Sequence, residues 1–388
     1  MTTKSIIRNS LFIATLALLV SCNQAPKTPA DSFTVTGTVK GLDTKYMSRS
    51  VSDKNGKRSS DSIFVKNGSF TYTAKIDKAE HIIFWPNVER TIKRSGRGYY
   101  PAKSSQFAFL AKPGDHIVFN GEVTDFINAY PSGNKENDDL GKINSKVFPL
   151  MNASVNYLLK KNKLKKDNPR VKIITDSIAQ LDAEVVTLKK EFILANSTSE
   201  AAVWYLSDMM LRRQLSNEDA VTAFKAFDKS LAEGSHYKQI ATRIKGIEST
   251  MIGKIVPDFT TSKTLDAKEF TFSSLRGKYV LIDFWGIWCG PCVAEMPTVK
   301  KYSEKYADKL TILGINSGDT KEKINAFIAT NGYKWSHLMS GKDDDNLVLR
   351  FNVSGFPTKF IIDPDGKILH RYLGDSEESF KKLDELLK

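Results

Sequence analysis

Asp283-Phe-Trp-Gly-Ile-Trp-Cys-Gly-Pro-Cys292 is the stretch that decides the fold and the chemistry of this chain. It continues an apolar run from Tyr279 that is typical of a buried strand. Two thiols at this spacing, at a strand-to-helix junction, form a small reversible disulfide, and the positive end of the helix dipole favours the thiolate of Cys289. The same spacing also supplies half of many zinc sites. Since the chain has 3 cysteines in all and no second pair, we expect redox chemistry and no metal site.

The remaining cysteine, Cys22, indicates where the protein works. Lys4 and Arg8 precede an apolar core over residues 11–20, which is the layout of a secretory signal and is too short to span a bilayer. Leu19-Val20-Ser21-Cys22 resembles the bacterial lipobox, so we expect Cys22 to be lipidated and to anchor the protein on the periplasmic side of the bacterial cell envelope. The alternative is an ordinary cleaved signal with a chance cysteine.

Length and charge set the domain organisation. At 388 residues the chain is too long for one small core, and its formal net charge of +13 lies mostly before residue 253. The basic run Lys160–Lys166 is either a solvated surface or a segment that attracts an anionic membrane or an acidic partner. It lacks the interleaved aromatic residues of a surface that binds nucleic acid. The predicted parts are a signal peptide and lipobox (1–22), a tether (23–30), a β-rich domain (31–130), a helical segment (131–250) and an α/β domain (251–388).

The two middle parts differ in hydrophobic period. Alternation around Phe33 and Val35 predicts strands, and Asn67-Gly68 predicts a hairpin, so an all-β, sandwich-like domain is expected. Helices are expected over 138–164, from Pro169 onward, and over 199–213, 216–232 and 236–250. The seam of Ile174, Ile178, Leu181, Val185, Leu188 and Phe192 lies on one helix face, and it packs either within its own chain or in a dimer.

The C-terminal part resembles a known family. The stretch around Cys289, together with Gly355-Phe356-Pro357-Thr358 before a strand, resembles the thioredoxin fold. Glu295-Met296-Pro297 and the opening Val256-Pro257-Asp258-Phe259 are closer to the membrane-associated TlpA/ResA-type branch. The resemblance covers residues 252–388, and strands are expected over 278–285, 310–315, 358–362 and 367–372. Residues 31–250 are similar in layout to the extension that precedes such domains in bacterial lipoproteins.

The dithiol and its loops receive separate roles. Cys289, at the start of the helix, is expected to be the exposed nucleophile, and Cys292 the resolving thiol that releases the reduced partner. Gly290 and Pro291 shape the loop, and the resemblance implies that their identity tunes the potential. It also implies that Pro357 is a cis-proline, which leaves the Phe356 backbone free to pair with an extended substrate.

Two acids and a tryptophan complete the predicted site. Asp283 lies in an apolar strand, where burial disfavours the carboxylate and makes it a usable proton acceptor near neutral pH. Glu295, three residues after Cys292, shares a helix face with that cysteine. The resemblance implies that these acids assist deprotonation of Cys292, although a structural Asp and a surface Glu remain alternatives. Trp288 is expected to frame the dithiol.

These features predict a membrane-anchored thiol–disulfide oxidoreductase that reduces protein disulfides without a cofactor. Gly290-Pro291 is the dipeptide of reducing thioredoxins. We therefore expect a reduction potential nearer the thioredoxin value of about −270 mV than the value of about −120 mV of a dedicated oxidant. Such a reductant needs electrons from a membrane thiol donor. An oxidase or isomerase, and a binding or scaffold lipoprotein with an accessory redox domain, are the alternatives. An exported lipoprotein meets no nucleic acid.

Overall fold

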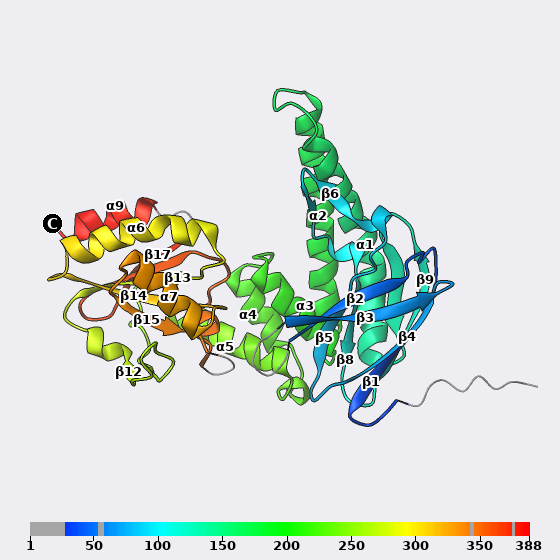
Figure 1. The fold of residues 1–388 in the computed structure, drawn as a ribbon, viewed down its shortest axis with the longest axis horizontal. Coiled ribbons are helices and arrows are strands. Elements are labelled where there is room, and N and C mark those ends of the chain that lie inside the picture. The colour runs from blue at the N-terminus through cyan, green and yellow to red at the C-terminus, as the bar shows by residue number, and fades with distance from the viewer. Residues whose placement is uncertain (1–27, 53–57, 342–344, 375–376) are drawn as a thin grey trace, which may run out of the picture.

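The computed structural model describes residues 28–52, 58–341, 345–374 and 377–388. The predicted signal, Cys22 and residues 23–27 of the predicted tether lie outside the described residues. Figure 1 shows a β-rich part, a helical part with a projecting hairpin, and a C-terminal α/β domain, which follow one another along the molecule. Among the helices of the described ranges, none is long and apolar enough to cross a membrane.

The β-rich part is built on one mixed sheet, which has six strands within the described residues. In spatial order they are β10 (Ile127–Ser132), β9 (His116–Val123), β1 (Ser32–Lys40), β4 (Ser69–Lys75), β3 (Arg58–Lys66) and β2 (Tyr46–Ser52). The hairpin predicted at Asn67-Gly68 joins β3 to β4, and both turn residues have positive φ, 51° and 74°. Asn followed by Gly tolerates this conformation, which fits the twist of paired strands.

The second layer of this part is small. It consists of β5 (Glu80–Phe84) paired with β8 (Phe107–Ala111), and its core is shared with the large sheet. Phe33, Phe84, Phe109 and Phe119 form this core, in which aromatic rings meet edge to face. Helix α1 contacts β8 and β10 at one border, so the sandwich-like domain that we expected is an unequal one. The short elements are η1 (Glu89–Thr91), β6 (Lys93–Ser95), β7 (Gly98–Tyr100) and η2 (Lys103–Ser105).

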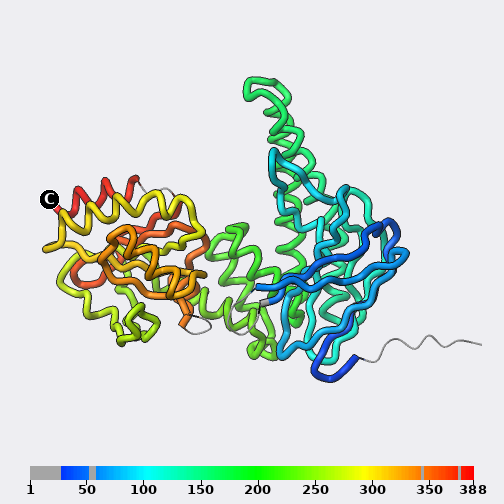
Figure 2. The backbone as a smooth tube through the Cα atoms, in the orientation of Figure 1, coloured from blue at the N-terminus to red at the C-terminus, as the bar shows by residue number. Residues whose placement is uncertain are grey.

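The helical part contains the helices expected from sequence. They are α1 (Lys135–Lys161), α2 (Arg170–Ala195), α3 (Glu200–Leu211), α4 (Asn217–Lys225), η3 (Lys229–Leu231) and α5 (Ser235–Ser249). Helices α1 and α2 form the projecting hairpin, and Lys160–Lys166 lies at its tip (Figure 2). Val185, Leu188 and Phe192 of the apolar seam join the core between these helices, so this end of the seam packs within its own chain.

The C-terminal domain has the sheet order β15-β14-β13-β16-β17. The strands are β13 (Tyr279–Trp285), β14 (Leu310–Asn316), β15 (Ser336–Met339), β16 (Thr358–Ile362) and β17 (Ile368–Leu373); the other elements are β11 (Thr260–Thr261), β12 (Phe270–Thr271), η4 (Phe272–Leu275), α6 (Gly290–Lys305), α7 (Lys321–Asn331), α8 (Leu347–Arg350) and α9 (Glu377–Leu386). β13 is central, as its apolar sequence predicted, and is parallel to β14 and antiparallel to β16. This is a thioredoxin-like arrangement.

The side chains of β13 alternate between two cores. Val280, Ile282 and Phe284 pack on one face of the sheet. Leu281 packs on the other face with Val299 of α6 and with α9. Since successive residues of a strand point to opposite faces, Asp283 lies on the same face as Leu281, the face that α6 covers.

Helix α5 joins the helical part to the C-terminal domain. The buried Arg243 donates to the Val353 carbonyl at 3.0 Å and to Asn352 Oδ1 at 3.3 Å. Gly246 allows the close approach, because a Cβ there would lie 2.5 Å from the Arg350 carbonyl oxygen. The extension therefore touches the segment that leads into Gly355-Phe356-Pro357.

Candidate active site

The two cysteines lie where β13 passes into α6. Cys289 is the N-cap residue of this helix, with extended backbone (φ −93°, ψ 96°), and its Sγ accepts a hydrogen bond from the Cys292 amide at 3.3 Å. Gly290 and Pro291 form the first turn, where the missing N–H of proline costs no helical hydrogen bond. The Cys289 sulfur thus lies at the positive end of the helix dipole, which favours a thiolate.

Cys289 and Cys292 are joined as a disulfide, with an S–S distance of 2.01 Å and a Cα–Cα distance of 5.3 Å. The expectation that Cys289 is exposed is wrong for this oxidised form: it is 5% exposed, against 2% for Cys292. The two sulfur atoms are bonded to each other, and the two cysteines pack in an apolar cluster with Trp285 and Met296. Exposed thiol surface cannot therefore distinguish the two cysteines here.

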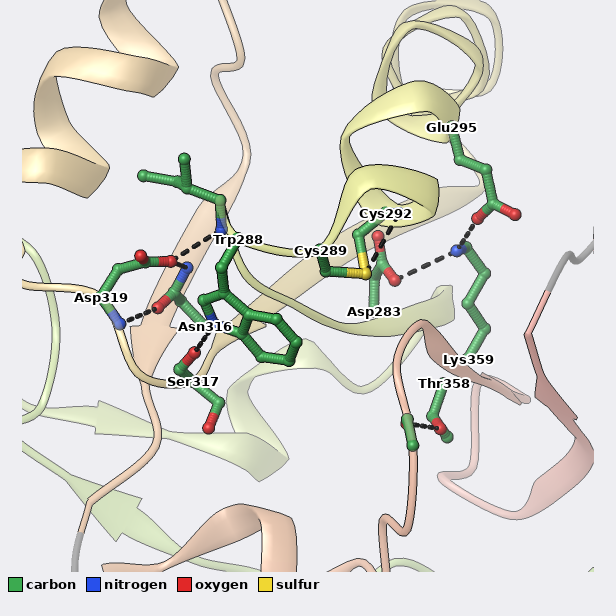
Figure 3. Close-up of a disulfide and its surroundings, with 12 residues drawn as sticks. Asp283, Trp288, Cys289, Cys292, Glu295, Asn316, Ser317, Asp319, Thr358 and Lys359 are labelled. Carbon is green, nitrogen blue, oxygen red and sulfur yellow. Dashed lines mark hydrogen bonds and ion pairs between the residues drawn. A yellow bond between two sulfur atoms is a disulfide. The ribbon is translucent and has the colours of Figure 1, made fainter. Parts of the chain in front are cut away.

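Trp288, next to Cys289, exposes 59% of its surface, and Gly290 and Pro291 between the cysteines are exposed as well. The Trp288 indole N–H donates to the Ser317 carbonyl at 2.7 Å (Figure 3). The Trp288 ring meets Phe356 edge-on, with centroids 5.1 Å apart. The preceding amide, of Ile287, donates to Asp319 Oδ2 at 2.7 Å. The loop is thus held from the end of β14. Sequence reasoning missed Asp319, although a polar Asn-Ser-Gly-Asp directly after a buried strand was a usable signal.

The second loop of the site carries the predicted cis-proline. The Phe356–Pro357 peptide bond is cis, so that expectation is confirmed. Thr358 Oγ1 donates to the Gly355 carbonyl at 2.7 Å, and the Pro357 carbonyl accepts from the Gly374 amide at 2.9 Å. Phe356 packs against the apolar cluster of the cysteines. The two loops that the sequence singled out, more than sixty residues apart, therefore meet at the disulfide.

Three charged side chains, two of them buried and one partly buried, lie on the α6 side of the sheet. Asp283 of β13 is opposite Lys359 of β16 in the antiparallel register, and Asp283 Oδ1 lies 3.2 Å from Lys359 Nζ. The same ammonium pairs with Glu295 Oε2, one turn beyond Cys292 on α6 (Figure 3). Side-chain exposure is 4% for Asp283, 1% for Lys359 and 14% for Glu295. One ammonium thus binds both predicted acids.

Burial and charge act in opposite directions within this triad. Burial raises the pKa of Asp283, and the nearby Lys359 offsets only part of that rise. Burial also acts to lower the pKa of Lys359, but Asp283 and Glu295 outweigh it, so the pKa of Lys359 is raised overall. The lysine stays protonated, and the raised pKa of Asp283 is the one predicted from its apolar strand. Lys359 itself was missed, although a lysine inside Thr358-Lys-Phe-Ile-Ile362 was a visible anomaly.

Comparisons with known proteins agree with this geometry. Residues 251–387 match the Redoxin family model, and residues 33–140 match a model described as a domain of unknown function, DUF4369. The thioredoxin-like protein YneN of Bacillus subtilis is 33% identical over 153 residues, 38% of this chain and 86% of YneN. The thiol-disulfide oxidoreductase ResA of Bacillus anthracis is 31% identical over 142 residues, 36% of this chain and 79% of ResA.

A solved structure, the thioredoxin domain of a thiol-disulfide oxidoreductase from Bacteroides vulgatus, is 26% identical, covers 36% of this chain and 99% of its own, and has a TM-score of 0.33. The relatives YneN and ResA are each covered over more than two thirds of their length by the C-terminal part of this chain. Through that domain, the chain belongs to the thioredoxin-like thiol-disulfide oxidoreductases of the ResA type.

Proposed function

We propose that this oxidoreductase is a lipid-anchored reductase of protein disulfides on the periplasmic side of the bacterial envelope, and that Cys289 and Cys292 carry its chemistry. The observation that carries the proposal is the disulfide at the start of α6, beside the cis Phe356–Pro357 bond. Trp288, Gly290, Pro291, Phe356 and Pro357 surround it and form the proposed substrate-binding surface.

The reaction transfers two electrons from the reduced dithiol to a substrate disulfide. The Cys289 thiolate attacks one substrate sulfur, which forms a mixed disulfide and expels the other substrate sulfur as a thiolate. The Cys292 thiolate then attacks Cys289 Sγ, which closes the Cys289–Cys292 disulfide and releases the second substrate thiolate. Both substrate thiolates take protons, so the substrate is reduced and the enzyme is oxidised.

The second step requires that Cys292 lose its proton. Asp283 lies on the α6 face of the sheet, and burial raises its pKa toward the range in which a carboxylate accepts a proton usefully. Glu295 lies on the same helix as Cys292 and shares Lys359 with Asp283. We assign Asp283 as the proton acceptor, with Glu295 as the second acid of the relay.

The charges near the dithiol favour the reducing direction. A strong oxidant of this kind stabilises its reduced thiolate. Here the first helical turn carries Gly290-Pro291 and no basic residue. The buried Lys359 is paired with two carboxylates, so this triad adds no net positive charge that would stabilise the Cys289 thiolate. The reduced form is therefore the more reactive one, and it needs a membrane thiol donor to restore it.

Two substitutions test the thiol roles. Cys292→Ser should accumulate a mixed disulfide with substrate proteins, because no resolving thiol remains, and Cys289→Ser should form none. The complexes are isolated from cells under non-reducing conditions and released by dithiothreitol. Accumulation with Cys289→Ser but not with Cys292→Ser would reverse the two roles.

A third substitution tests the anchor. Since acyl chains contribute about 0.8 kcal/mol per buried CH₂, Cys22→Ser should move the exported protein from the membrane fraction to the soluble fraction. Membrane association that persists in an exported Cys22→Ser protein would contradict lipidation as the main anchor.

A further inference from the structure

A polar cavity lies in the extension, far along the chain from the redox site. Its volume is about 230 Å³, and it lies between the helical hairpin and the η2 segment. Val155 of α1 and Val185 of α2 belong to its apolar wall, while Lys103, Ser104, Lys189 and Arg212 supply polar groups. Figure 1 shows β6, just before this segment, beside the hairpin of α1 and α2.

Lys189 is the most buried of the charges at this cavity, with 1% of its side chain exposed. Among the described residues, its ammonium makes one hydrogen bond, of 3.4 Å to Gln214 Oε1, and lies 4.0 Å from Asp208 Oδ2. Both distances exceed those of a good hydrogen bond. A buried ammonium with three N–H groups is costly unless they find acceptors.

The carboxylate of Asp208 is already shared. Lys103 pairs with it at 2.6 Å and Arg212 at 3.0 Å. Among the described residues, Asp182 is the acid that lines the cavity, and Asp208 lies behind the wall; the Asp182 side chain accepts from Ser154 at 2.7 Å and is exposed to solvent. Among the described residues around the cavity, three basic side chains therefore face two carboxylates, which leaves one positive charge over when all three are protonated.

The hydroxyl of Ser104 is a second, independent sign of a ligand. This residue is fully buried, it lines the cavity, and its Oγ has no hydrogen-bond partner in the part of the chain that the structure describes. Buried hydroxyls are almost always paired, so one that faces a cavity beside an under-paired ammonium indicates an acceptor that occupies the cavity.

We propose that this cavity binds a small organic carboxylate. Its carboxylate group would accept from Lys189, Lys103 and Ser104, and its short apolar body would lie against Val155 and Val185. This gives the extension a ligand-binding role that is separate from thiol–disulfide exchange.

Butyrate and its neutral isostere butyramide test the proposal, with binding to the purified protein measured by ligand-observed NMR and calorimetry. Butyrate should bind and butyramide should not. Lys189→Met should weaken butyrate binding about tenfold or more, since a charge-assisted hydrogen bond is lost. Burial holds the pKa of Lys103 at about 8. Raising the pH through that value removes the charge of Lys103 and should therefore weaken the binding of butyrate to the wild-type protein.

Two variants separate binding from folding. Ser104→Ala removes a hydroxyl without a partner, so it should leave the thermal midpoint unchanged while weakening butyrate binding severalfold. Lys190→Met is the matched control, because Lys190 is on the same helix but pairs with Asp219 and is not part of the cavity wall. Equal binding of butyrate and butyramide, no binding of butyrate at millimolar concentration, or unchanged affinity in Lys189→Met would each overturn the proposal.

Discussion

Lys359→Met removes the only ammonium that pairs with both Asp283 and Glu295 in the part of the chain that the structure describes. The variant would leave two carboxylates near each other in a site where Asp283 is 4% exposed. Breaking a buried ion pair by removing one partner costs about 3–5 kcal/mol. We therefore expect the free energy of unfolding to fall by about that amount at pH 8.

The loss should depend on pH with a definite sign. Folding raises the pKa of Asp283, which means that the folded state favours the protonated carboxyl. The stability that this protonated group contributes is fully present below its unfolded pKa and is lost as the pH rises through its folded pKa. Without Lys359 the attraction that holds this pKa down disappears, and the pKa rises further. Each further unit adds about 1.4 kcal/mol to the destabilisation. This additional destabilisation is complete at a pH above the pKa of Asp283 in the variant, and it is absent at a pH well below the pKa of Asp283 in the wild type.

Urea unfolding at pH 8 and pH 5, followed by tryptophan fluorescence, measures both effects. The matched control is Lys301→Met, which changes an exposed lysine on α6 and should be neutral within about 0.5 kcal/mol. The reasoning would be refuted if Lys359→Met lost less than about 1 kcal/mol at pH 8, or if it lost as much at pH 5 as at pH 8.

Two further predictions concern the proton acceptor and the domain junction. Asp283→Asn should slow the resolution step at neutral pH more than it slows the first attack, and Glu295→Gln should slow resolution less than Asp283→Asn does. Stopped-flow decay of the mixed disulfide measures the resolution rate. Equal rates for both variants and the wild type between pH 6 and 8 would exclude the proton relay. In the wild type, resolution should slow as the pH falls through the raised pKa of Asp283, because the protonated acid accepts no proton. Arg243→Met should cost about 1–3 kcal/mol, because the Val353 carbonyl loses a buried donor, and should speed hydrogen exchange in residues 352–356, whereas the exposed Lys245→Met should do neither.

Local patterns predicted most of the architecture. The apolar run that ends at Trp285 predicted a buried strand, and the helical period of the extension predicted its helices to within a few residues, except that the helix expected over 216–232 ends at Lys225 and is followed by η3. β15 was missed because Ser336–Met339 is short and has no alternation of its own; it becomes a strand through parallel pairing with β14. The sandwich-like domain that we expected has one large and one small sheet, because β8 pairs with β5 whereas β9 joins the six-stranded sheet.

The site was predictable where its signals are local. The cysteine pair and the proline loop each lie within one short motif. The apolar sequence around Asp283 predicted that the pKa of this carboxyl is raised. Lys359 could not be placed in the same way, because its pairing with Glu295 joins residues from β16 and α6 that only the fold brings together. The burial of Cys289 depends on the disulfide and on packing by distant residues, which no local pattern reports.

The redox potential tests the central claim most directly, because it decides whether the dithiol donates or withdraws electrons. Equilibration of the purified protein with glutathione buffers, with the reduced and oxidised forms separated after acid quenching, gives the potential of the Cys289–Cys292 pair. A reductase should have a value near that of thioredoxin, about −270 mV. A value above about −180 mV, the level of a disulfide isomerase, would contradict the reductase account and favour an oxidase or isomerase.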